Sequence, residues 1–570
     1  MTTDFHFSPR PNRAGEISWE PWGDRAFERA RREDKPILLA ISAVWCHWCH
    51  VMDETTYSDT GVINAIREHY VPVRVDNDER PDVNARYNMG GWPTTAFLTP
   101  EGTVLTGATY LPPEHMLRAL DEVASFYDER KPEIERKVAE LRSAGVNYQL
   151  APASALRAEI VDEFTQGICS SYDEEFAGFN EAPKFPQPEV YEFLLSQWRR
   201  TSDPKLYEIV SRSMQAMAHG GMYDHVEGGF FRYSTTRDWT VPHFEKMADD
   251  HAGLLRVLAQ LYLWAPSDIV RKDLTRTLDY VRSVLRDPGT GFFAGSQDAD
   301  EEYYALDLAE RRRREAPFVD RRSYSNWTAA LAGAFAWCGL ALRERAVVDE
   351  ALFTLDGMHE RLRDRDGLLF HVLAPGEEPR IRGLLGDQAA YLRALLDAYE
   401  ISGEPRLLER AREHADATIA ALGAPDGGFV DAQVEPLGRL EVPDRPIVDN
   451  GVMAENLLRL GSILHEPAYR DAAERTLRLY GGSFRGASSF GATWVRAVAR
   501  FLEPEVTVRV AGDLERNAEL RRAARLLPSP FVTASSEAGP ATAAYVCKGT
   551  TCAPPATDPQ ELSSAYASLA

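Results

Sequence analysis

The sequence predicts a multi-domain protein: an N-terminal α/β domain, a central all-α region of six helical hairpins and a small C-terminal α/β appendage. Apolar strand-like runs alternate with helical stretches before residue 145. Long amphipathic stretches separated by glycine–aromatic loops then fill residues 150–502, and β-rich runs return in residues 503–570. A chain of 570 residues is too long for one hydrophobic core, so several domains are expected.

The first domain, residues 1–145, combines strands and helices around a pair of cysteines. Cys46-x-x-Cys49 directly follows the first apolar run and precedes a helical stretch. The resulting β–α–β order, followed by β–β–α, is that of a thioredoxin fold. Helices are expected at 24–33, at 52–70 with a break at Ser58-Asp59, at 114–126 and at 131–142, and strands at 36–42, 70–76, 95–99 and 104–107.

The second domain is predicted to contain twelve helices in six hairpins. Tight connections alternate with long loops in which a glycine precedes aromatic or apolar residues, at Gly178, Gly228, Gly291, Gly367 and Gly427. Such repetition indicates stacked hairpins. The long polar loops favour a closed (α/α)6 toroid over an open solenoid. The helices are expected to start near 154, 188, 204, 249, 267, 325, 346, 386, 404, 449, 466 and 490.

The C-terminal region has two β-rich runs, Val506–Val510 and Ala544–Cys547. Cys547 and Cys552 are a second pair of nearby cysteines. The sequence leaves open whether they form a second redox couple or are two ordinary cysteines of a small domain.

Composition and charge exclude several classes of protein. The formal net charge of −23 argues against nucleic-acid binding, and Arg311–Arg314 is a short run beside many acids. No apolar stretch approaches the roughly 18 residues of a membrane span, and the first residues lack a secretory pattern. Six cysteines in so long a chain do not form a disulfide scaffold. A cytoplasmic protein is therefore expected.

The Cys46–Cys49 pair predicts thiol–disulfide exchange. A helix start would lower the pKa of Cys46, and protonated His47 and His50 would add positive charge. Cys46 is therefore expected to be the partly exposed attacking thiol, and Cys49 the resolving thiol. Trp48 lies between the two cysteines. Pro93, if its peptide bond is cis, would place a backbone edge beside Cys46 for an extended client.

Three alternatives remain for this motif. Cys46-x-x-Cys49-His50 also matches a haem attachment pattern, although nothing else indicates haem. Zinc could bind the two cysteines with neighbouring histidines, but no second cysteine pair lies nearby. The two cysteines could also be purely structural. No metal and no cofactor are expected.

The barrel loops carry acids, histidines and aromatic residues, which is the composition of sugar-binding sites. A pair of carboxylates could provide general acid–base chemistry, and a histidine pair could serve epimerisation. Alternatively, Asp249, Asp387 and Asp449 are ordinary helix N-caps and the loop aromatics only cover the core. The candidate cleft residues are Lys184, His225, Glu227, His243, Glu245, Lys246, Asp298 and Asp300.

Several motifs resemble the spermatogenesis-associated thioredoxin-like protein family. They include Cys46-His47-Trp48-Cys49-His50-Val51-Met52, Gly90-Gly91-Trp92-Pro93, Ala182-Pro183-Lys184-Phe185-Pro186 and His225-Val226-Glu227-Gly228-Gly229-Phe230-Phe231. The resemblance implies a thioredoxin-like domain joined to a barrel similar to acylglucosamine 2-epimerases and six-hairpin glycosidases. This chain departs from the family in a shortened insert at Tyr87-Asn88-Met89 and in Glu302–Leu306, which replaces a Phe-Tyr-x-Trp segment.

Together these observations predict a thiol–disulfide oxidoreductase that uses Cys46 and Cys49, with a barrel that binds a substrate or client. The alternatives are a carbohydrate-active enzyme with a regulatory thioredoxin-like domain, and a non-catalytic or zinc-binding scaffold. The expected partners are a thiol or disulfide client, or a reductant, and a carbohydrate ligand. Neither nucleic acid nor a membrane is expected as a partner.

Overall fold

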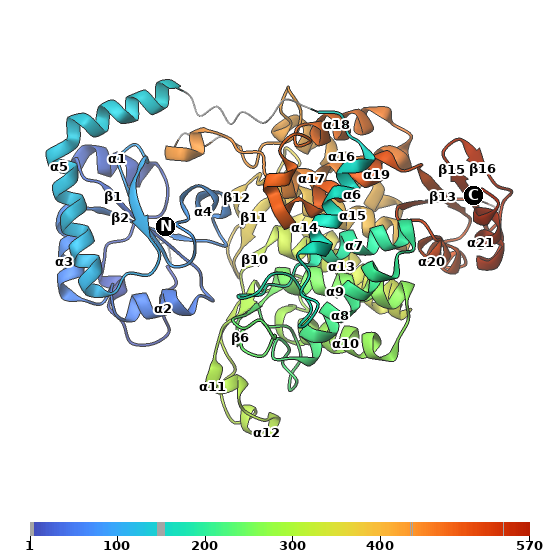
Figure 1. The fold of residues 1–570 in the computed structure, drawn as a ribbon, viewed down its shortest axis with the longest axis horizontal. Coiled ribbons are helices and arrows are strands. Elements are labelled where there is room, and N and C mark those ends of the chain that lie inside the picture. The colour runs from blue at the N-terminus through green and yellow to red at the C-terminus, as the bar shows by residue number, and fades with distance from the viewer. Residues whose placement is uncertain (1–4, 145–153, 434, 436, 540, 570) are drawn as a thin grey trace. The chain divides into compact units, whose positions relative to one another are not determined.

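The computed structural model describes residues 5–144, 154–433, 435, 437–539 and 541–569. The described residues form two compact units, whose ribbons are drawn in Figure 1. The first unit lies within residues 1–149 and 432–444, and the second within residues 150–431 and 445–570.

The first unit is built on a four-stranded sheet with the order β2-β1-β3-β4. β1 runs parallel to β2 and antiparallel to β3, and β3 is antiparallel to β4. All residues of β1 and β3 are buried, because helices cover both faces of the sheet. The predicted thioredoxin-like topology is thus confirmed. The strands are β1 (Ile37–Ser42), β2 (Val71–Asp76), β3 (Thr94–Leu98) and β4 (Val104–Ala108).

The helices of this unit differ from the expected ones in three places. The expected interrupted helix over 52–70 is two helices, and the second begins where the Asp59 side chain accepts a hydrogen bond from the Val62 N–H. The stretches at 114–126 and 131–142 form one continuous helix, and α4 was not predicted. The helices are α1 (Asp24–Glu33), α2 (His47–Glu54), α3 (Thr60–His69), α4 (Pro81–Tyr87) and α5 (Pro113–Ala144), with a 3₁₀ turn at Ala14–Glu16.

A segment from the C-terminal half of the sequence completes the hydrophobic core of the first unit. Residues 432–444 belong to this unit, although sequence analysis assigned them to the barrel region 150–502. Leu437 and Leu440 are buried in the same apolar cluster as Tyr87. Gly438 has a φ of +55°, and a Cβ there would lie 2.3 Å from the Tyr87 hydroxyl oxygen, so only glycine fits. A 3₁₀ turn, η3 (Gly438–Glu441), holds the two leucines in place.

The second unit contains the predicted ring of helical hairpins. Each of six inner helices packs against the next, and the last, α19, packs against the first, α7, which closes the ring. The described helices begin within four residues of their predicted starts. The inner helices are α7 (Pro188–Thr201), α9 (Ala248–Trp264), α13 (Ser325–Leu342), α15 (Leu385–Ser402), α17 (Ile447–Leu464) and α19 (Ala492–Leu502). The outer helices are α6 (Ala158–Ser170), α8 (Pro204–His219), α10 (Asp268–Tyr280), α14 (Arg345–Arg361), α16 (Pro405–Leu422) and α18 (Pro467–Arg478).

The long loops repeat one construction before successive inner helices. A turn closed by an antiparallel bridge carries an aspartate, and a lysine or arginine farther along the loop pairs with it. These pairs are Asp173–Lys184, Asp224–Lys246, Asp364–Arg382 and Asp426–Arg445. The loops also contain η2 (Val281–Leu285), α11 (Glu301–Tyr304), α12 (Leu308–Arg311), η4 (Phe484–Gly491) and the short strands β5 (Tyr233–Ser234), β6 (Pro242–His243), β7 (Lys246–Met247), β8 (Ser296–Gln297), β9 (Val319–Asp320), β10 (Ser323–Tyr324), β11 (Phe370–Leu373) and β12 (Arg380–Arg382).

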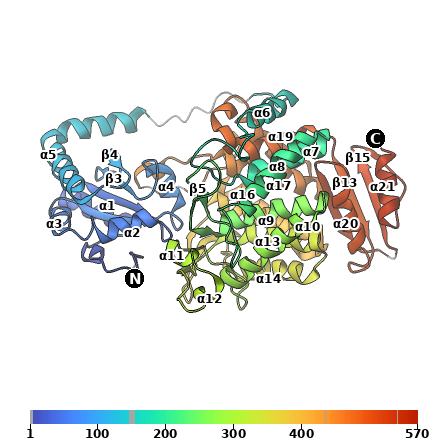
Figure 2. The ribbon, with the colours of Figure 1, turned by 60° about the horizontal axis from the view of Figure 1, so that its bottom comes forward.

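The C-terminal region repeats the strand topology of the first unit (Figure 2). Its sheet has the order β14-β13-β15-β16, in which β13 is parallel to β14 and antiparallel to β15, and β15 is antiparallel to β16. In both sheets the crossover helix packs against the final helix: α3 against α5, and α20 against α21. The elements are β13 (Val506–Ala511), α20 (Ala518–Leu526), β14 (Val532–Glu537), β15 (Ala543–Lys548), β16 (Thr551–Cys552) and α21 (Pro559–Ala567). The region belongs to the same compact unit as the barrel.

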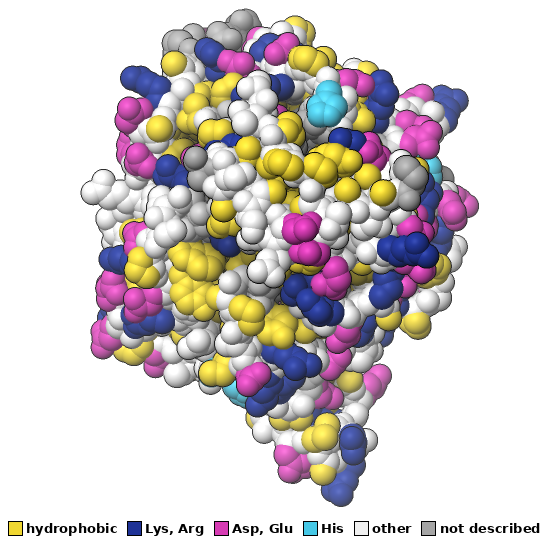
Figure 3. Space-filling model, turned by 90° about the vertical axis from the view of Figure 1, so that its right-hand side faces the viewer, with side chains coloured by type: hydrophobic (Ala, Val, Ile, Leu, Met, Phe, Trp, Pro, Cys, Tyr) yellow, Lys and Arg dark blue, Asp and Glu magenta, His cyan; other side chains and the backbone are white. Residues whose placement is uncertain are grey.

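Acidic and basic side chains alternate over the molecular face shown in Figure 3, and no broad field of basic residues appears on that face. This distribution agrees with the negative net charge. Within the described part of the chain, every helix is too short or too polar to cross a lipid bilayer.

Candidate functional site

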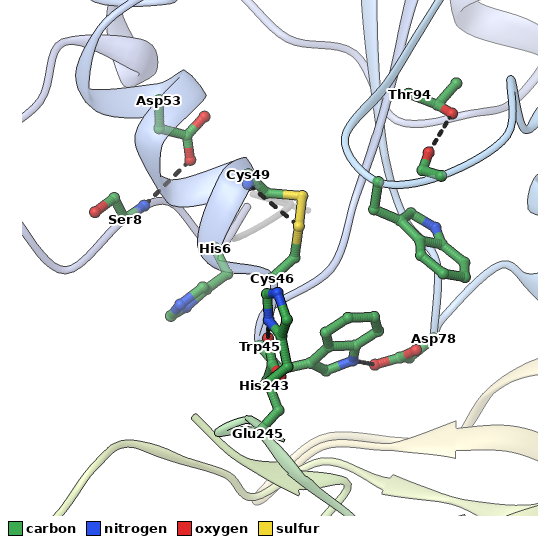
Figure 4. Close-up of a disulfide and its surroundings, with 12 residues drawn as sticks. His6, Ser8, Trp45, Cys46, Cys49, Asp53, Asp78, Thr94, His243 and Glu245 are labelled. Atoms are coloured by element: carbon green, nitrogen blue, oxygen red, sulfur yellow. Dashed lines mark hydrogen bonds and ion pairs between the residues drawn. A yellow bond between two sulfur atoms is a disulfide. The ribbon is translucent and has the colours of Figure 1, made fainter. Parts of the chain in front are cut away.

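The cysteine pair lies at the start of the helix that follows the central strand of the first sheet. β1 ends at Ser42, and Cys46 is the N-cap residue of α2. The Cys46 Sγ accepts a hydrogen bond from the Cys49 N–H at 3.2 Å. The two cysteines form a disulfide with their Cα atoms 5.2 Å apart (Figure 4). Because unpaired N–H groups at a helix start favour negative charge, this position stabilises a Cys46 thiolate when the pair is reduced.

Both cysteines are buried. Cys46 is 5% exposed and Cys49 is 3% exposed, so the expected difference in accessibility is small. Next to them, Trp48 is 48% exposed and its ring lies 5.2 Å from that of Tyr110. An exposed aromatic pair beside a disulfide offers apolar area to a client, since amphipathic rings are favoured at contact surfaces.

The segment between β2 and β3 contains the loop of the cis-proline, Pro93. The Trp92–Pro93 peptide bond is cis. The Thr94 hydroxyl donates to the Gly91 carbonyl oxygen at 2.7 Å and accepts from the Met89 N–H at 3.0 Å. The Trp92 indole N–H donates to Asn84 of α4 at 3.1 Å. The helix that sequence analysis missed therefore positions the tryptophan of this loop.

A second tryptophan contact ties the motif to the sheet. The Trp45 indole N–H donates to the Asp78 carboxylate at 2.7 Å (Figure 4), and the Trp45 and Trp92 rings meet edge to face at 5.7 Å. Asp78 is 4% exposed and also accepts from the Asn77 side chain. The Asp76–Asp78 segment after β2 therefore orients the residue that precedes Cys46.

The two histidines of the motif, His47 and His50, do not both supply positive charge to Cys46. Burial lowers the pKa of His50 to about 4, and the nearby His6 lowers it further. His50 is therefore neutral at pH 7, and the expectation that it supplies positive charge to Cys46 is wrong. His47 is exposed and packs edge to face against Trp48, with the ring centroids 5.7 Å apart.

A buried ion pair lies farther along α2. Both carboxylate oxygens of Asp53 accept from Arg74 of β2, at 2.8 and 2.9 Å, and Asp53 also accepts from the Ser8 N–H. Asp53 is 1% exposed and Arg74 is 5% exposed. This pair fixes α2 to the sheet one turn beyond Cys49, and no pattern in the sequence indicated it.

In the second unit, the two candidate lysines are structural groups. Lys184 is fully buried and donates to Asp173 and to the Ala177 carbonyl oxygen. Lys246 is also fully buried and donates to Asp224 at 2.8 Å. Burial lowers the pKa of Lys246 to about 8, against the opposing effect of Asp224. Both lysines hold their loops, and neither has surface for a substrate.

The remaining candidate residues of the barrel loops have different partners and different degrees of exposure. Glu227 shares Arg311 with Asp224, and the Tyr303 hydroxyl donates to it. His225 is exposed, Asp298 is 8% exposed, and Asp300 caps α11 through the Tyr303 N–H.

His243 and Glu245 do come together. Their Nδ1 and Oε1 atoms are 3.4 Å apart. The His243 ring stacks on Tyr233 at 4.5 Å, and Tyr233 stacks on Phe185 at 4.6 Å. Phe185 is 43% exposed. A stack of rings beside a histidine–carboxylate pair can bind the apolar face of a sugar and move a proton.

Carboxylates at the starts of the inner helices form a group that sequence analysis set aside as caps. Asp249, Asp387 and Asp449 are not N-caps, because those positions are Met247, Leu384 and Pro446. Enclosure by the surrounding helices raises the pKa of Asp449 to about 7, with a further contribution from the charges of Asp387 and Asp431.

The same enclosure acts on a second set of carboxylates. Burial raises the pKa of Asp250 well above its usual value, and the charges of Asp249, Glu189 and Glu245 add to this effect. The pKa values of Asp249 and Glu189 are also raised, chiefly because the surrounding protein reduces their hydration, although both side chains keep exposed surface. A carboxyl group with a pKa of about 7, such as that of Asp449, is suited to act as a general acid. Among the described residues, no three or more histidines, cysteines or acids are grouped to hold a metal ion.

Known proteins resemble parts of this chain in sequence. Residues 10–144 match the family model Thioredox_DsbH, described as "Protein of unknown function, DUF255". The resemblance predicted from the sequence is confirmed. The chain is 35% identical over 309 residues to spermatogenesis-associated protein 20 of Homo sapiens, which covers 50% of this chain and 39% of that protein. A shorter match, 33% over 79 residues, is to the thiol:disulfide interchange protein DsbD of Campylobacter jejuni, covering 12% of this chain and 14% of that protein.

Solved structures resemble the helical region at low identity. Cellobiose 2-epimerase from Spirochaeta thermophila covers 60% of this chain with a TM-score of 0.49 and 17% identity, over 98% of its own length. A family 76 glycoside hydrolase from Bacteroides thetaiotaomicron covers 60% with a TM-score of 0.45 and 14% identity, over 98% of its length. The barrel fold itself is seen directly in the closed ring of inner helices.

Proposed function

We propose that this protein is a thiol–disulfide oxidoreductase that acts through Cys46 and Cys49, with a barrel that binds the substrate or client. The observation that carries the proposal is the position of Cys46 at the N-cap of α2, with the Cys49 N–H directed at its sulfur. The likeness to an interchange protein over 79 residues supports it. As part of this proposal, we place the activity in the cytoplasm.

The exchange runs through a mixed disulfide. The reduced Cys46 thiolate attacks one sulfur of a client disulfide, and the other client sulfur leaves as a thiolate. The Cys49 thiolate then attacks Cys46, which releases the second client sulfur and forms the Cys46–Cys49 disulfide. The client gains two electrons and the pair loses two. A dithiol reductant must restore the pair by the reverse exchange.

The pH dependence of alkylation tests the proposal. In a Cys49→Ser variant of the full chain, the rate of iodoacetamide modification of Cys46 is measured by mass spectrometry from pH 4 to 10. We expect a Cys46 pKa below the usual value of about 8.5. Cys169 is an internal control, because burial raises the pKa of its thiol. A Cys46 that reacts no faster than Cys169 at pH 7 would refute the proposal.

The apolar surface beside the pair provides a second test. A Trp48→Ala variant removes the exposed ring and leaves both sulfurs in place. We expect the variant to raise the KM for unfolded protein clients more than the KM for small disulfides, because only a large client contacts the ring. Phe126→Ala is the matched control, since Phe126 is 49% exposed but lies on α5.

A carbohydrate-active enzyme is the second candidate function. It is favoured by the aromatic stack at His243 and by the raised pKa of Asp449. A panel of mono- and disaccharides is assayed for epimerisation and hydrolysis with the wild type, His243→Ala, Asp449→Asn and Cys46→Ser. Turnover that is lost in the first two variants and kept in the third would establish it. Absence of both turnover and binding in the wild type would eliminate it.

A further inference from the structure

The interior of the barrel contains a cavity that the proposed exchange does not use. Its volume is about 60 Å³. Inner helices provide most of the lining, and Arg525 of α20 and residues 529–532, which follow α20, provide the rest. A space of this size is larger than one water molecule requires and is lined mainly by polar groups. It is called the arginine cavity below, after the residues Arg256, Arg459, Arg496, Arg500 and Arg525.

The charges around this cavity do not balance. The carboxylates that line it are Glu192, Asp397 and Glu455, which leaves two arginines in excess. Just outside the lining, Glu400 and Arg393 extend the network and offset each other. All four carboxylates are below 10% exposed. Buried charges are normally paired, so an excess of two cations in the protein interior requires an explanation.

Each lining carboxylate is already shared between arginines. Arg256 pairs with both Glu192 and Asp397, each at 2.5 Å. Arg496 pairs with both Glu192, at 3.2 Å, and Glu455, at 2.5 Å. The lining carboxylates therefore have no spare capacity to neutralise further guanidinium groups.

Arg459 pairs with Asp397, at 2.8 Å, and with Glu400, at 3.2 Å. The last two arginines, Arg500 and Arg525, each pair with one carboxylate among the described residues. Arg500 reaches Glu455 at 3.2 Å and the Thr533 hydroxyl at 3.3 Å. Arg525 donates to the Val532 carbonyl oxygen and pairs with Glu400. Burial lowers the pKa of both guanidinium groups to about 10, and the positive charges of neighbouring arginines lower it further.

Two buried donors that line the cavity have no acceptor in the described structure. They are the indole N–H of Trp337 and the Nε–H of Arg525. Trp337 is 6% exposed, and the side chain of Arg525 is 8% exposed. Native proteins rarely leave buried donors unpaired, so two such donors in one cavity point to a ligand that accepts from both. The two side chains also lie against each other, with the guanidinium carbon 5.9 Å from the indole ring.

We propose that the arginine cavity binds a small dianionic oxyanion: inorganic phosphate or the phosphoryl group of a small metabolite. A phosphoryl group carries a charge between about −1.5 and −2 at pH 7, which matches the excess of two arginines, whereas a carboxylate supplies only half of it. Its oxygens accept in several directions, so they can satisfy the Trp337 and Arg525 donors together. Arginine is the side chain best suited to such groups.

A bound oxyanion would join two parts of the second unit. Arg525 belongs to α20 of the C-terminal region, whereas Arg500 and Trp337 belong to inner helices α19 and α13. A single anion between them neutralises repulsion that otherwise acts across this junction. Binding should therefore stabilise the folded barrel together with its C-terminal region.

Stability measurements on the full chain test the proposal. Thermal unfolding is followed by circular dichroism in increasing inorganic phosphate, with sodium chloride used to keep the ionic strength constant. Anion-free protein is prepared by dialysis, and any phosphate released on denaturation is measured by ion chromatography. We expect the unfolding midpoint to rise with phosphate, because a ligand at one hundred times its dissociation constant stabilises the folded state by about 2.7 kcal/mol.

Variants locate the effect. Trp337→Phe keeps the aromatic packing and removes one donor, and we expect it to weaken phosphate binding about tenfold. Arg525→Gln should abolish the phosphate-dependent shift. If it prevents folding, Trp337→Phe decides alone. The matched control is Arg485→Gln, because Arg485 is an exposed arginine of the same unit that pairs with Glu163.

The two ligand sources are distinguished by the same assay. A shift with glucose 6-phosphate that exceeds the shift with inorganic phosphate assigns the cavity to a phosphorylated metabolite, and the opposite order assigns it to free phosphate. A midpoint that does not depend on phosphate, sulfate or glucose 6-phosphate, together with no released anion, would overturn the proposal. An equal shift in wild type and Trp337→Phe would overturn it as well.

Discussion

The replacement Asp449→Asn should make the barrel more stable at alkaline pH and leave its stability unchanged at acidic pH. The carboxyl group of Asp449 is enclosed near Asp387 and Asp431, which raises its pKa in the folded state from 3.8 to about 7. In the unfolded chain it ionises near pH 4. Between these values the folded state holds one more proton than the unfolded state, so the stability of the wild type falls as pH rises. Asparagine carries no such proton and removes this dependence.

The size of the effect follows from the two pKa values. A difference of about three pH units corresponds to about 4 kcal/mol at pH 8, and to nothing below pH 4. The assay is urea unfolding of the full chain at pH 5, 6, 7 and 8, followed by circular dichroism at 222 nm, which is dominated by the barrel helices. The free-energy difference between variant and wild type should grow across this range.

A matched exposed aspartate provides a control of opposite sign. Asp426 pairs with Arg445, which holds the pKa of this carboxyl below its usual value. Asp426→Asn should therefore be slightly destabilising at pH 7 and without effect at low pH. If Asp449→Asn is neutral or destabilising at pH 8, Asp449 is ionised in the folded barrel and its role as a proton donor is excluded.

Three further predictions concern stability. Arg74→Met should lower the free energy of unfolding by about 3–5 kcal/mol in urea, because it leaves the buried Asp53 carboxylate without its partner. Adding Asp53→Leu should recover most of this loss. A loss that persists in the double variant would contradict the prediction. Gly178→Ala should cost at least about 2 kcal/mol, because φ is +75° and a Cβ would lie 2.4 Å from Trp239, whereas Gly486→Ala, with open space around it, should be neutral in the same assay. The double variant Cys547→Ser/Cys552→Ser should lose about 2 kcal/mol of C-terminal stability, measured by hydrogen exchange of β15, and unchanged exchange would show that the disulfide is not formed.

The periodic elements could be predicted from the sequence. The helices of the barrel begin close to their predicted starts because long amphipathic stretches bounded by turn residues carry a strong signal. The thioredoxin-like order followed from alternating apolar strands and one cysteine motif. Residues 432–444 could not be assigned, because nothing local shows that Leu437 and Leu440 enter a core formed hundreds of residues earlier.

The site was only partly predictable. The location of Cys46 at a helix start was correct, but its low exposure and the neutral state of His50 depend on neighbours distant in sequence. Lys184 and Lys246 looked like binding groups because a lysine in a polar loop is normally exposed, whereas each is drawn inward by an aspartate of the preceding turn. The arginine cavity left no local pattern either, since its residues are spread over separate helices.

The two sheets of equal strand order have an implication for how such chains are classified. In the first, sulfur stands at the carboxyl end of the central strand; in the second, the corresponding turn from Gly512 to Asn517 holds none, and the cysteines sit on an edge hairpin instead. An ancestral duplication that kept the scaffold and discarded the chemistry would leave this trace. The shared fold therefore does not assign the same function to both regions, and a function must be argued for each from its own cysteines.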